Sequence, residues 1–312
     1  MIRTVTGHNV RGLVSLVPLV SAEFLTFSHF LTRKTATNYN KEDVSTGERT
    51  LAFTVPVLHD SRGPFWSSLS NSSLTMPQSG YVLTKTHCGS RCNRCPIRGY
   101  LEDHETFLYQ CLRSHYMKQD DDGTFLETHD VYDQSLVSKA VHLIRDPYDN
   151  VVSRFHLSYR RFANTNQTEM TKKYPKSREG FRSWCWDLGE RFNKDEQGSR
   201  FYEHLDDVED IPCHADFFRW IQWHNHAFTT TWDMALPTLV MYYENYTTAF
   251  DETMNTLLDF LEQKQVAEPP PFVTGKTYDY FTEGEVKAIE VMLRKLAMEG
   301  VWNLISHYFG GN

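Results

Sequence analysis

The sequence lacks any run of apolar residues long enough to cross a membrane confidently as a helix. It also lacks a positive charge balance: its 312 residues carry a formal net charge of −8, which argues against a general nucleic-acid binder. An anionic ligand would therefore need a local basic pocket that works against the overall field. Low-complexity tracts are few and no internal repeat occurs, which excludes a largely disordered chain.

What the sequence does contain is the material of a substantial core. Hydrophobic residues make up 40% of the chain, aromatic residues 14% and charged residues 23%. The length fits one large α/β domain or two small ones. We expect an N-terminal segment over residues 1–35 and a single α/β domain over residues 36–312, with a cysteine-rich insertion at 88–111.

The N-terminal segment allows two interpretations. Arg3 and Arg11 precede the apolar run 12–20, and Ser21-Ala22 follows it. This order resembles a signal peptide with a V-S-A cleavage site. The other interpretation is a buried strand that leads into a helix over residues 22–31.

Cysteines and glycosylation sequons both bear on the compartment. Sequons of the N-x-[ST] type occur at Asn71, Asn166 and Asn245, which favours a secretory route and a glycoprotein. The even number of cysteines allows three disulfide bonds without fixing their connectivity. We expect disulfide bonds that tie the insertion Cys88 to Cys111 to the core. The six cysteines are Cys88, Cys92, Cys95, Cys111, Cys185 and Cys213.

Three of these cysteines support a rival hypothesis. Cys88, Cys92 and Cys95 have the C-x3-C-x2-C spacing of radical S-adenosylmethionine enzymes, in which three thiolates hold an iron–sulfur cluster. Arg94 stands where that family usually has an aromatic residue, and no glycine-rich segment follows closely. Zinc binding with His87 lacks a second pair of ligands. Disulfide bonds are the simpler interpretation, and no metal is expected.

Hydrophobic patterning predicts strands that alternate with helices. The predicted strands cover residues 81–86, 140–144 and 236–243. The predicted helices cover residues 21–32, 106–117, 149–157, 217–228, 249–261 and 283–298. The polar, basic stretch 164–182 is predicted to be a mobile surface segment. Strands separated by helices indicate an α/β fold with a central, mainly parallel sheet flanked by helices.

The stretch from Lys139 to Phe155 is the most informative one. Its apolar first half suits a buried strand, and Asp146-Pro147 ends that strand because proline fits the first turn of a helix. Arg145 then lies where a strand ends and a helix begins, the edge at which open α/β sheets bind ligands. Arg145 and Ser153, eight residues on, could hold two oxygens of one phosphate. Alternatively, Arg145 pairs with Asp146 or Asp149.

A second polar group ends an earlier predicted strand. Lys85, Thr86 and His87 close the run 81–86, so we expect them at the same sheet edge as Arg145. A histidine there could accept a proton from a substrate hydroxyl, and a lysine could stabilise charge on a transferring group. An ordinary loop histidine and lysine are the alternative.

These motifs together resemble those of sulfotransferases. The stretch I-R-D-P-Y-D-N-V-V-S-R-F is similar to that family's 3′-phosphate-binding segment, which has a serine eight residues after the arginine. Lys85-Thr86-His87 resembles its catalytic Lys-Thr-His. Tyr243-Glu244 resembles a segment that follows a late strand. The matched motifs run in family order from about residue 81 to residue 246.

The resemblance implies a P-loop-like sulfotransferase fold and transfer of a sulfuryl group from 3′-phosphoadenosine 5′-phosphosulfate, the co-substrate. By that mapping His87 is the general base and Lys85 neutralises the bridging region of the donor. Arg145 and Ser153 hold the 3′-phosphate. The implied partner is a hydroxyl or amine of a glycan or protein acceptor. The Golgi lumen is the implied location, with the cytoplasm as the alternative.

The sequence departs from the family at one place. The family has a glycine-rich loop of the P-K-S-G-T-T type after its first strand, whose backbone N–H groups cradle the phosphosulfate. No such loop precedes Lys85, so the loop is missing or degenerate. Alternatively, the stretch 84–91 is itself the phosphosulfate loop, with Lys85 as its lysine. A catalytically inactive, sulfotransferase-like binding protein is therefore the second hypothesis.

Overall fold

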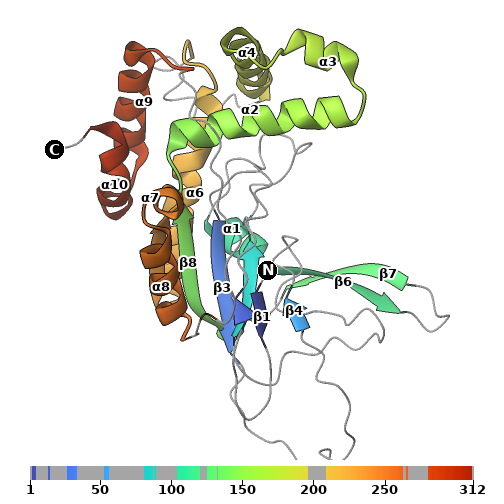
Figure 1. The fold of residues 1–312 in the computed structure, drawn as a ribbon, viewed down its shortest axis with the longest axis vertical. Coiled ribbons are helices and arrows are strands. Elements are labelled where there is room, and N and C mark those ends of the chain that lie inside the picture. The colour runs from blue at the N-terminus through green and yellow to red at the C-terminus, as the bar shows by residue number, and fades with distance from the viewer. Residues whose placement is uncertain are drawn as a thin grey trace, which may run out of the picture.

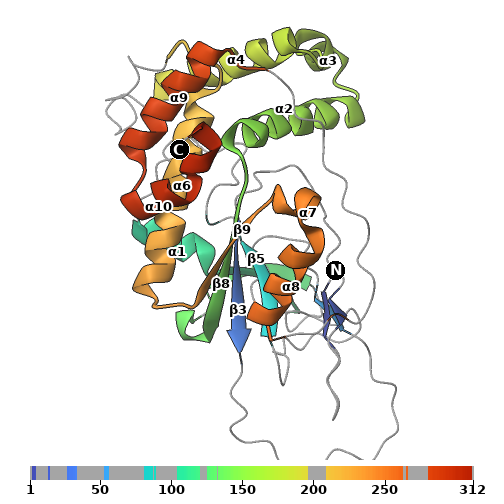
Figure 2. The same ribbon diagram turned by 60° about the vertical axis from the view of Figure 1, so that its left-hand side comes forward.

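The computed structural model describes residues 2–4, 13–14, 27–33, 53–55, 81–86, 88, 104–119, 125–131, 133–195, 209–262, 265 and 280–310. Helices dominate these ranges, and a small mixed sheet lies among them (Figures 1 and 2). None of the helices in the described ranges combines the length and the apolar character that a membrane crossing needs.

Four strands form the sheet that positions the candidate site, in the order β5-β3-β8-β9. They cover Tyr81–Thr86 (β5), Phe27–Arg33 (β3), Val137–Ile144 (β8) and Thr238–Tyr242 (β9). Strands β8 and β9 are parallel, whereas β3 is antiparallel to both β5 and β8. The predicted mainly parallel sheet is therefore correct only in part, because a reversed strand separates β5 from the parallel pair.

Strand β3 corrects the helix predicted over residues 21–32. Residues 27–33 form a central strand that pairs with β5 on one side and β8 on the other. Short apolar runs fit a helix and a strand almost equally well by periodicity. Here the backbone hydrogen bonds offered by two neighbouring strands decide in favour of the strand.

The register of β3 fixes how its two neighbours are aligned. Ser28 pairs with Thr86 of β5 and also with His142 of β8, so these two residues are level across the sheet. Strand β5 and strand β8 run in the same direction, as expected. Strand β8, however, continues for two residues beyond the level of Thr86, and Arg145 follows its end.

Helices cover both faces of the parallel pair. In Figure 2, α1 (His104–Cys111) and α6 (His214–Asp233) lie on one side of β8 and β9, and α7 (Asn245–Thr248) and α8 (Phe250–Phe260) lie on the other. Helix α2 (Pro147–Asn164) leaves the end of β8 and runs across the top of the molecule (Figure 1). The helices predicted over 149–157, 217–228, 249–261 and 283–298 are thereby confirmed, the last as α9 (Glu283–Leu296).

Two further predictions require correction. The helix predicted over 106–117 ends as α1 at Cys111, and β6 (Arg113–Gln119) follows it and pairs with β7 (Phe125–Val131) as an antiparallel hairpin. The hairpin projects away from the sheet (Figure 1). The predicted mobile segment 164–182 instead contains α3 (Thr168–Lys173) and the start of α4 (Arg178–Asp195).

The remaining described elements are a second small sheet, two 3-10 helices and a short C-terminal helix. A second sheet has the order β2-β1-β4, with β1 at Ile2–Thr4, β2 at Leu13–Val14 and β4 at Phe53–Val55. Strand β8 is preceded by the 3-10 helix η2 (Gln134–Leu136). The chain closes with α10 (Glu299–Ile305) and the 3-10 helix η4 (Ser306–Phe309).

The main core lies above the sheet, where α2, α4, α6 and α9 meet. Its largest fully buried side chains there include Phe155, Phe181, Phe217 and Trp220, each at most 2% exposed. These rings belong to three helices, so the core fixes the position of α2, which begins directly after Arg145. Aromatic side chains of this size contribute most of the apolar surface that such a core buries.

The described residues form two disulfide bonds. Cys88–Cys111 joins the segment after β5 to the end of α1, which confirms the predicted tie between the insertion and the core. Cys185–Cys213 joins α4 to the residue before α6. Disulfide bonds are typical of oxidising compartments. The iron–sulfur hypothesis requires a thiolate at Cys88, whereas Cys88 here forms a disulfide bond. The other two cysteines of that motif lie outside the described residues.

Candidate functional site

Arg145 is the first residue after β8 and is almost completely buried, with 7% of its surface exposed. Its guanidinium carbon lies 4.5 Å from the centroid of the Tyr243 ring, at the end of the neighbouring strand. Within the described residues, neither its Nε nor its Nη1 has a hydrogen-bond partner. Buried polar groups are nearly always hydrogen-bonded, so a buried guanidinium with two unused donors is typical of a site for an anionic ligand.

The alternative pairing of Arg145 with Asp146 or Asp149 is not present as an ion pair. None of the ion pairs formed between described residues includes Arg145. The charge of Arg145 does reach Asp149, where it opposes a pKa rise caused mainly by burial of that carboxyl. Arg145 is therefore near carboxylates without being neutralised by direct contact.

Ser153 lies on α2 and is half-buried, as a ligand-contacting side chain can be. Asn150, three residues earlier, lies on the same helix face because positions i and i+3 are neighbours on a helix. Asn150 is 3% exposed, and its Nδ2 has no hydrogen-bond partner within the described residues. Asn150 is not among the site residues predicted from the sequence, although its spacing of three residues from Ser153 was a usable signal.

Helix α2 begins in a way that the sequence predicts. Asp146 is its N-cap, and its Oδ1 accepts hydrogen bonds from the backbone N–H groups of Tyr148 at 2.8 Å and Asp149 at 3.0 Å. Pro147 occupies the first turn, where its missing N–H costs nothing. The cap fixes the direction of α2, and with it the position of Ser153 relative to Arg145.

Glu244 connects three parts of the site. Its Oε1 accepts a hydrogen bond of 2.9 Å from the backbone N–H of Asp146, and its Oε2 accepts one of 2.8 Å from the Tyr308 hydroxyl. The end of β9 is thus joined to the start of α2 and to the 3-10 helix η4. The motif Tyr243-Glu244 therefore has a structural role here: Tyr243 packs on Arg145, and Glu244 holds the neighbouring helix start.

Three carboxyl groups, those of Asp146, Asp149 and Glu244, lie near Arg145 and offset part of its positive charge. Burial raises the pKa of Asp146 to about 6, and the charges of Asp149 and Glu244 contribute to that rise. Burial likewise raises the pKa of Asp149. An anion bound to Arg145 would be repelled by these groups when they are ionised, so binding must depend on the hydrogen bonds and charge of the guanidinium.

Lys85 reaches the same edge of the sheet but not the immediate surroundings of Arg145. It pairs with His29, which also pairs with Val141, four residues before Arg145. Four residues of strand rise about 13 Å, and two strand spacings add about 10 Å sideways, so the two Cα atoms are roughly 16 Å apart. His87 lies outside the described residues.

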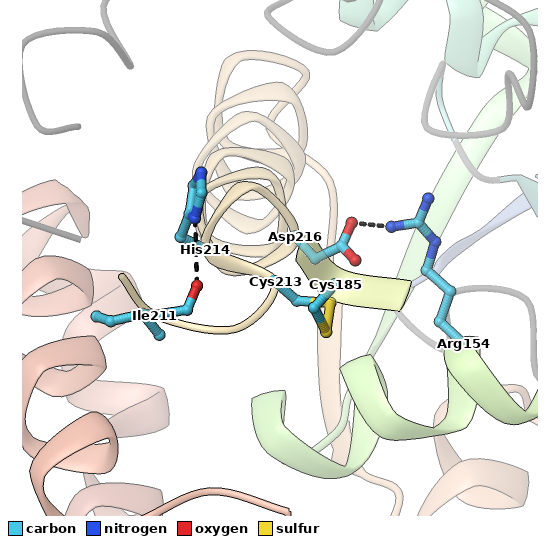
Figure 3. The surroundings of a disulfide bond; sticks show 6 residues. All are labelled: Arg154, Cys185, Ile211, Cys213, His214 and Asp216. Atoms are coloured by element: carbon cyan, nitrogen blue, oxygen red, sulfur yellow. Dashed lines mark hydrogen bonds and ion pairs between the residues drawn. A yellow bond between two sulfur atoms is a disulfide. The ribbon is translucent and has the colours of Figure 1, made fainter. Parts of the chain in front are cut away.

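The middle of α2 is held by a buried ion pair beside the Cys185–Cys213 disulfide bond (Figure 3). Arg154, next to Ser153, pairs with Asp216 in the first turn of α6, and both side chains are largely buried. The guanidinium carbon of Arg154 also lies 5.5 Å from the centroid of the Trp184 ring. This contact fixes α2, α4 and α6 to one another one residue away from the candidate ligand contact.

Two fully buried histidines belong to β8 and α6, respectively. His142 of β8 places its Nε2 3.2 Å from Thr231 Oγ1 of α6. His224 of α6 packs between Trp220 and Trp223, and neither of its ring nitrogens has a partner within the described residues. Burial lowers the pKa of each histidine to about 3. Both are therefore neutral at physiological pH and act as core residues.

Removing the Tyr308 hydroxyl tests whether Glu244 holds the site together. We expect Tyr308→Phe to lower the free energy of unfolding by about 1–2 kcal/mol, because one oxygen of a half-buried carboxylate loses its donor. Thermal unfolding followed by circular dichroism measures this loss. The exposed Tyr109 provides the control, since Tyr109→Phe removes a hydroxyl without an expected change. Equal melting temperatures for wild type and Tyr308→Phe would contradict the role of Glu244.

No family model, curated protein or solved structure matches the chain. The resemblance to sulfotransferases therefore rests on the three sequence motifs alone. Two of them, at Arg145 and at Tyr243-Glu244, lie in contact at the ends of β8 and β9. The third, at Lys85, lies on a strand that runs in the same direction.

Proposed function

We propose that this protein binds 3′-phosphoadenosine 5′-phosphosulfate and transfers its sulfuryl group to an acceptor, as a sulfotransferase of P-loop-like fold. The observation that carries the proposal is the buried Arg145, whose Nε and Nη1 have no hydrogen-bond partner within the described residues. A phosphate would use these donors and neutralise the buried charge. Ser153 and the Nδ2 of Asn150 supply further donors on the adjoining helix face.

The proposed roles divide along the sheet edge. Arg145 and Ser153 hold the 3′-phosphate of the donor. Lys85 stabilises the charge that develops on the transferring group, and His87 accepts the proton of the acceptor hydroxyl. The separation of roughly 16 Å between Lys85 and Arg145, estimated from strand geometry, suits a ligand that spans a nucleotide rather than a single phosphate.

The compartment and acceptor follow from the same proposal. The two disulfide bonds support an oxidising compartment, and we propose the Golgi lumen, where the acceptor is a hydroxyl or amine of a glycan or a protein. The cytoplasm is the alternative location. The second candidate function is an inactive binding protein of the same fold, favoured by the absence of a glycine-rich loop before Lys85.

Isothermal titration calorimetry with two nucleotides tests the phosphate site. We expect 3′-phosphoadenosine 5′-phosphate to bind, and adenosine 5′-phosphate, which lacks the 3′-phosphate, to bind at least about 30-fold more weakly. Loss of charge-assisted hydrogen bonds to a buried guanidinium accounts for about 2 kcal/mol of that difference. Equal affinities, or no binding of either nucleotide, would overturn the proposed site.

A transfer assay separates the enzyme from the inactive binding protein. With a donor carrying radioactive sulfur and a mixture of glycan and protein acceptors, we expect labelled product from wild type and none from His87→Ala. Nucleotide binding should be equal in both proteins, because His87 contacts the acceptor and not the 3′-phosphate. Nucleotide binding without any sulfuryl transfer by wild type would favour the inactive binding protein. Full turnover by His87→Ala would show that His87 is not the general base.

Asp146 should weaken nucleotide binding through its charge. Asp146→Asn keeps a side-chain oxygen that can cap α2, because asparagine and aspartate are comparable N-cap residues. It removes the negative charge that forms as pH rises above the Asp146 pKa of about 6. We expect about 5-fold tighter nucleotide binding at pH 7.5, equal to about 1 kcal/mol. The exposed Asp251→Asn serves as the control, and unchanged affinity in Asp146→Asn would refute the effect.

A further inference from the structure

The turn between α2 and α3 presents a sequon at the surface. Asn166, Gln167 and Thr168 form it, and all three side chains are exposed, as are the residues on either side. The turn is ordered by backbone hydrogen bonds: Asn166 N donates to Ala163 O at 3.2 Å, and Gln167 N donates to Phe162 O at 2.9 Å. The side chains of the other two sequon residues also bond within the turn: Gln167 Nε2 donates to Thr165 Oγ1 at 2.9 Å, and Thr168 Oγ1 donates to the Asn166 carbonyl at 3.5 Å. The turn is therefore held without the side-chain amide of Asn166.

The conformation of Asn166 suits an exposed modification site. Its φ of 54° lies in the left-handed region, which asparagine tolerates better than most residues. Within the described residues no hydrogen bond uses its side-chain amide, whereas its backbone carbonyl accepts from Thr168 N at 2.9 Å. A large group attached to the amide nitrogen would extend into solvent without displacing any contact of the fold.

We propose that Asn166 carries an N-linked glycan. The two disulfide bonds provide independent support, because they indicate the same oxidising, secretory environment in which sequons are modified. In the transfer step the Asn166 Nδ2–C1 bond forms and the C1–O bond of a lipid-pyrophosphate-linked oligosaccharide breaks. The lipid pyrophosphate leaves with the bonding electron pair, and the amide loses one proton to a base of the transferring enzyme.

The position of Asn166 keeps the glycan away from the candidate site. Helix α2 spans 18 residues, about 27 Å, and separates the turn from Arg145. The sequon at Asn245 differs, because Asn245 directly follows Glu244, whose carboxylate holds Asp146 and Tyr308. A glycan at Asn166 is thus compatible with ligand binding at the other end of the helix, and it does not depend on sulfuryl transfer.

Expression of the full chain behind a secretory leader in a eukaryotic host tests the proposal. We expect peptide-N-glycosidase to increase the electrophoretic mobility of wild type. Mass spectrometry of peptides from a protease digest of the deglycosylated protein should then show aspartate in place of asparagine at residue 166. Thr168→Ala should lose the glycan at Asn166 while keeping the asparagine itself. Thr168→Ser, which preserves the sequon, should retain it and is the matched control.

Two outcomes would overturn the proposal. The first is an unmodified peptide around Asn166 in secreted wild type, whatever is found at the other sequons. The second is a glycan at Asn166 that persists in Thr168→Ala, which would show that the sequon does not direct it. Asn245→Gln should leave the modification at Asn166 unchanged, and this variant separates the two described sequons from each other.

Discussion

Arg145→Met is expected to weaken binding of 3′-phosphoadenosine 5′-phosphate at least 100-fold, about 2.7 kcal/mol. The guanidinium supplies both the positive charge and the hydrogen-bond donors of the proposed phosphate site. Methionine fills a similar volume over the Tyr243 ring and supplies neither. Titration calorimetry on both proteins measures the loss, and unchanged affinity would exclude Arg145 from the site.

The same variant should not destabilise the protein without ligand. A buried charge with unused donors raises the free energy of the folded state, so its replacement by an apolar side chain is expected to keep or raise the melting temperature. A fall of several degrees would instead show that Arg145 has a structural role. Arg145→Lys should bind 3′-phosphoadenosine 5′-phosphate with an affinity between those of wild type and Arg145→Met, since an ammonium group keeps the charge but lacks the guanidinium fork. Arg160→Met, at an exposed position of α2, is the control for charge alone.

Acid is expected to destabilise the fold strongly through His142 and His224. Both have a pKa of about 3 in the folded protein, below the 6.5 of an exposed histidine. Between pH 6.5 and about 3 the unfolded state therefore binds more protons than the folded state, and stability falls as pH falls. Each histidine contributes about 1.4 kcal/mol per pH unit in this window, so the pair removes about 4 kcal/mol at pH 5.

Two carboxyl groups, those of Asp146 and Asp149, have raised pKa values and oppose this trend. The pKa of Asp146 is raised to about 6, so its protonation stabilises the folded state as pH falls below 6, by about 1.4 kcal/mol at pH 5. Together His142, His224 and Asp146 then remove about 2–3 kcal/mol at pH 5, a large part of the 5–15 kcal/mol typical of folded proteins. His156 and His214, whose pKa values are also lowered by burial, act in the same direction as the pair.

Two substitutions assign the acid effect to the buried pair. His224→Phe keeps an aromatic ring between Trp220 and Trp223 and removes two ring nitrogens that have no partner within the described residues. His142→Gln keeps a polar group near Thr231 without a titrating proton. Urea unfolding from pH 7 to pH 5 should show a shallower pH dependence in each variant. If the free energy of unfolding depends on pH as steeply in both variants as in wild type, these histidines are not the cause of the acid effect.

The sequence predicted three of the four strands of the main sheet well. Strands β5, β8 and β9 and the helix after β8 follow directly from apolar runs and from Asp146-Pro147, because local propensity and tertiary packing agree there. The prediction failed at β3, where residues 27–33 have a pattern that suits either element and the partners are remote in sequence. It also failed at the hairpin of β6 and β7, because the helix predicted over 106–117 covered most of β6 and no strand was predicted at β7.

The sequence predicted individual residues of the candidate site but not the contacts between them. The sequence indicated Arg145 and Ser153 by their spacing, and Tyr243 by its place after a strand. It could not show that Arg145 lies buried over the Tyr243 ring, nor that Glu244 bonds both Asp146 and Tyr308. Such contacts join residues more than 60 positions apart, and they depend on the strand register, which a single sequence does not specify.

The central position of β3 has a consequence for the order in which the chain is synthesised. Of the four strands of the main sheet, β3 emerges first during translation, and β8, its partner on one side, follows about 100 residues later, roughly 5–20 s at typical elongation rates. In that interval β5 is complete and can pair with one edge of β3, while the other edge stays open. An open strand edge invites pairing with other chains. The nascent protein thus passes through a stage in which a chaperone bound at that edge would raise the yield of folded product.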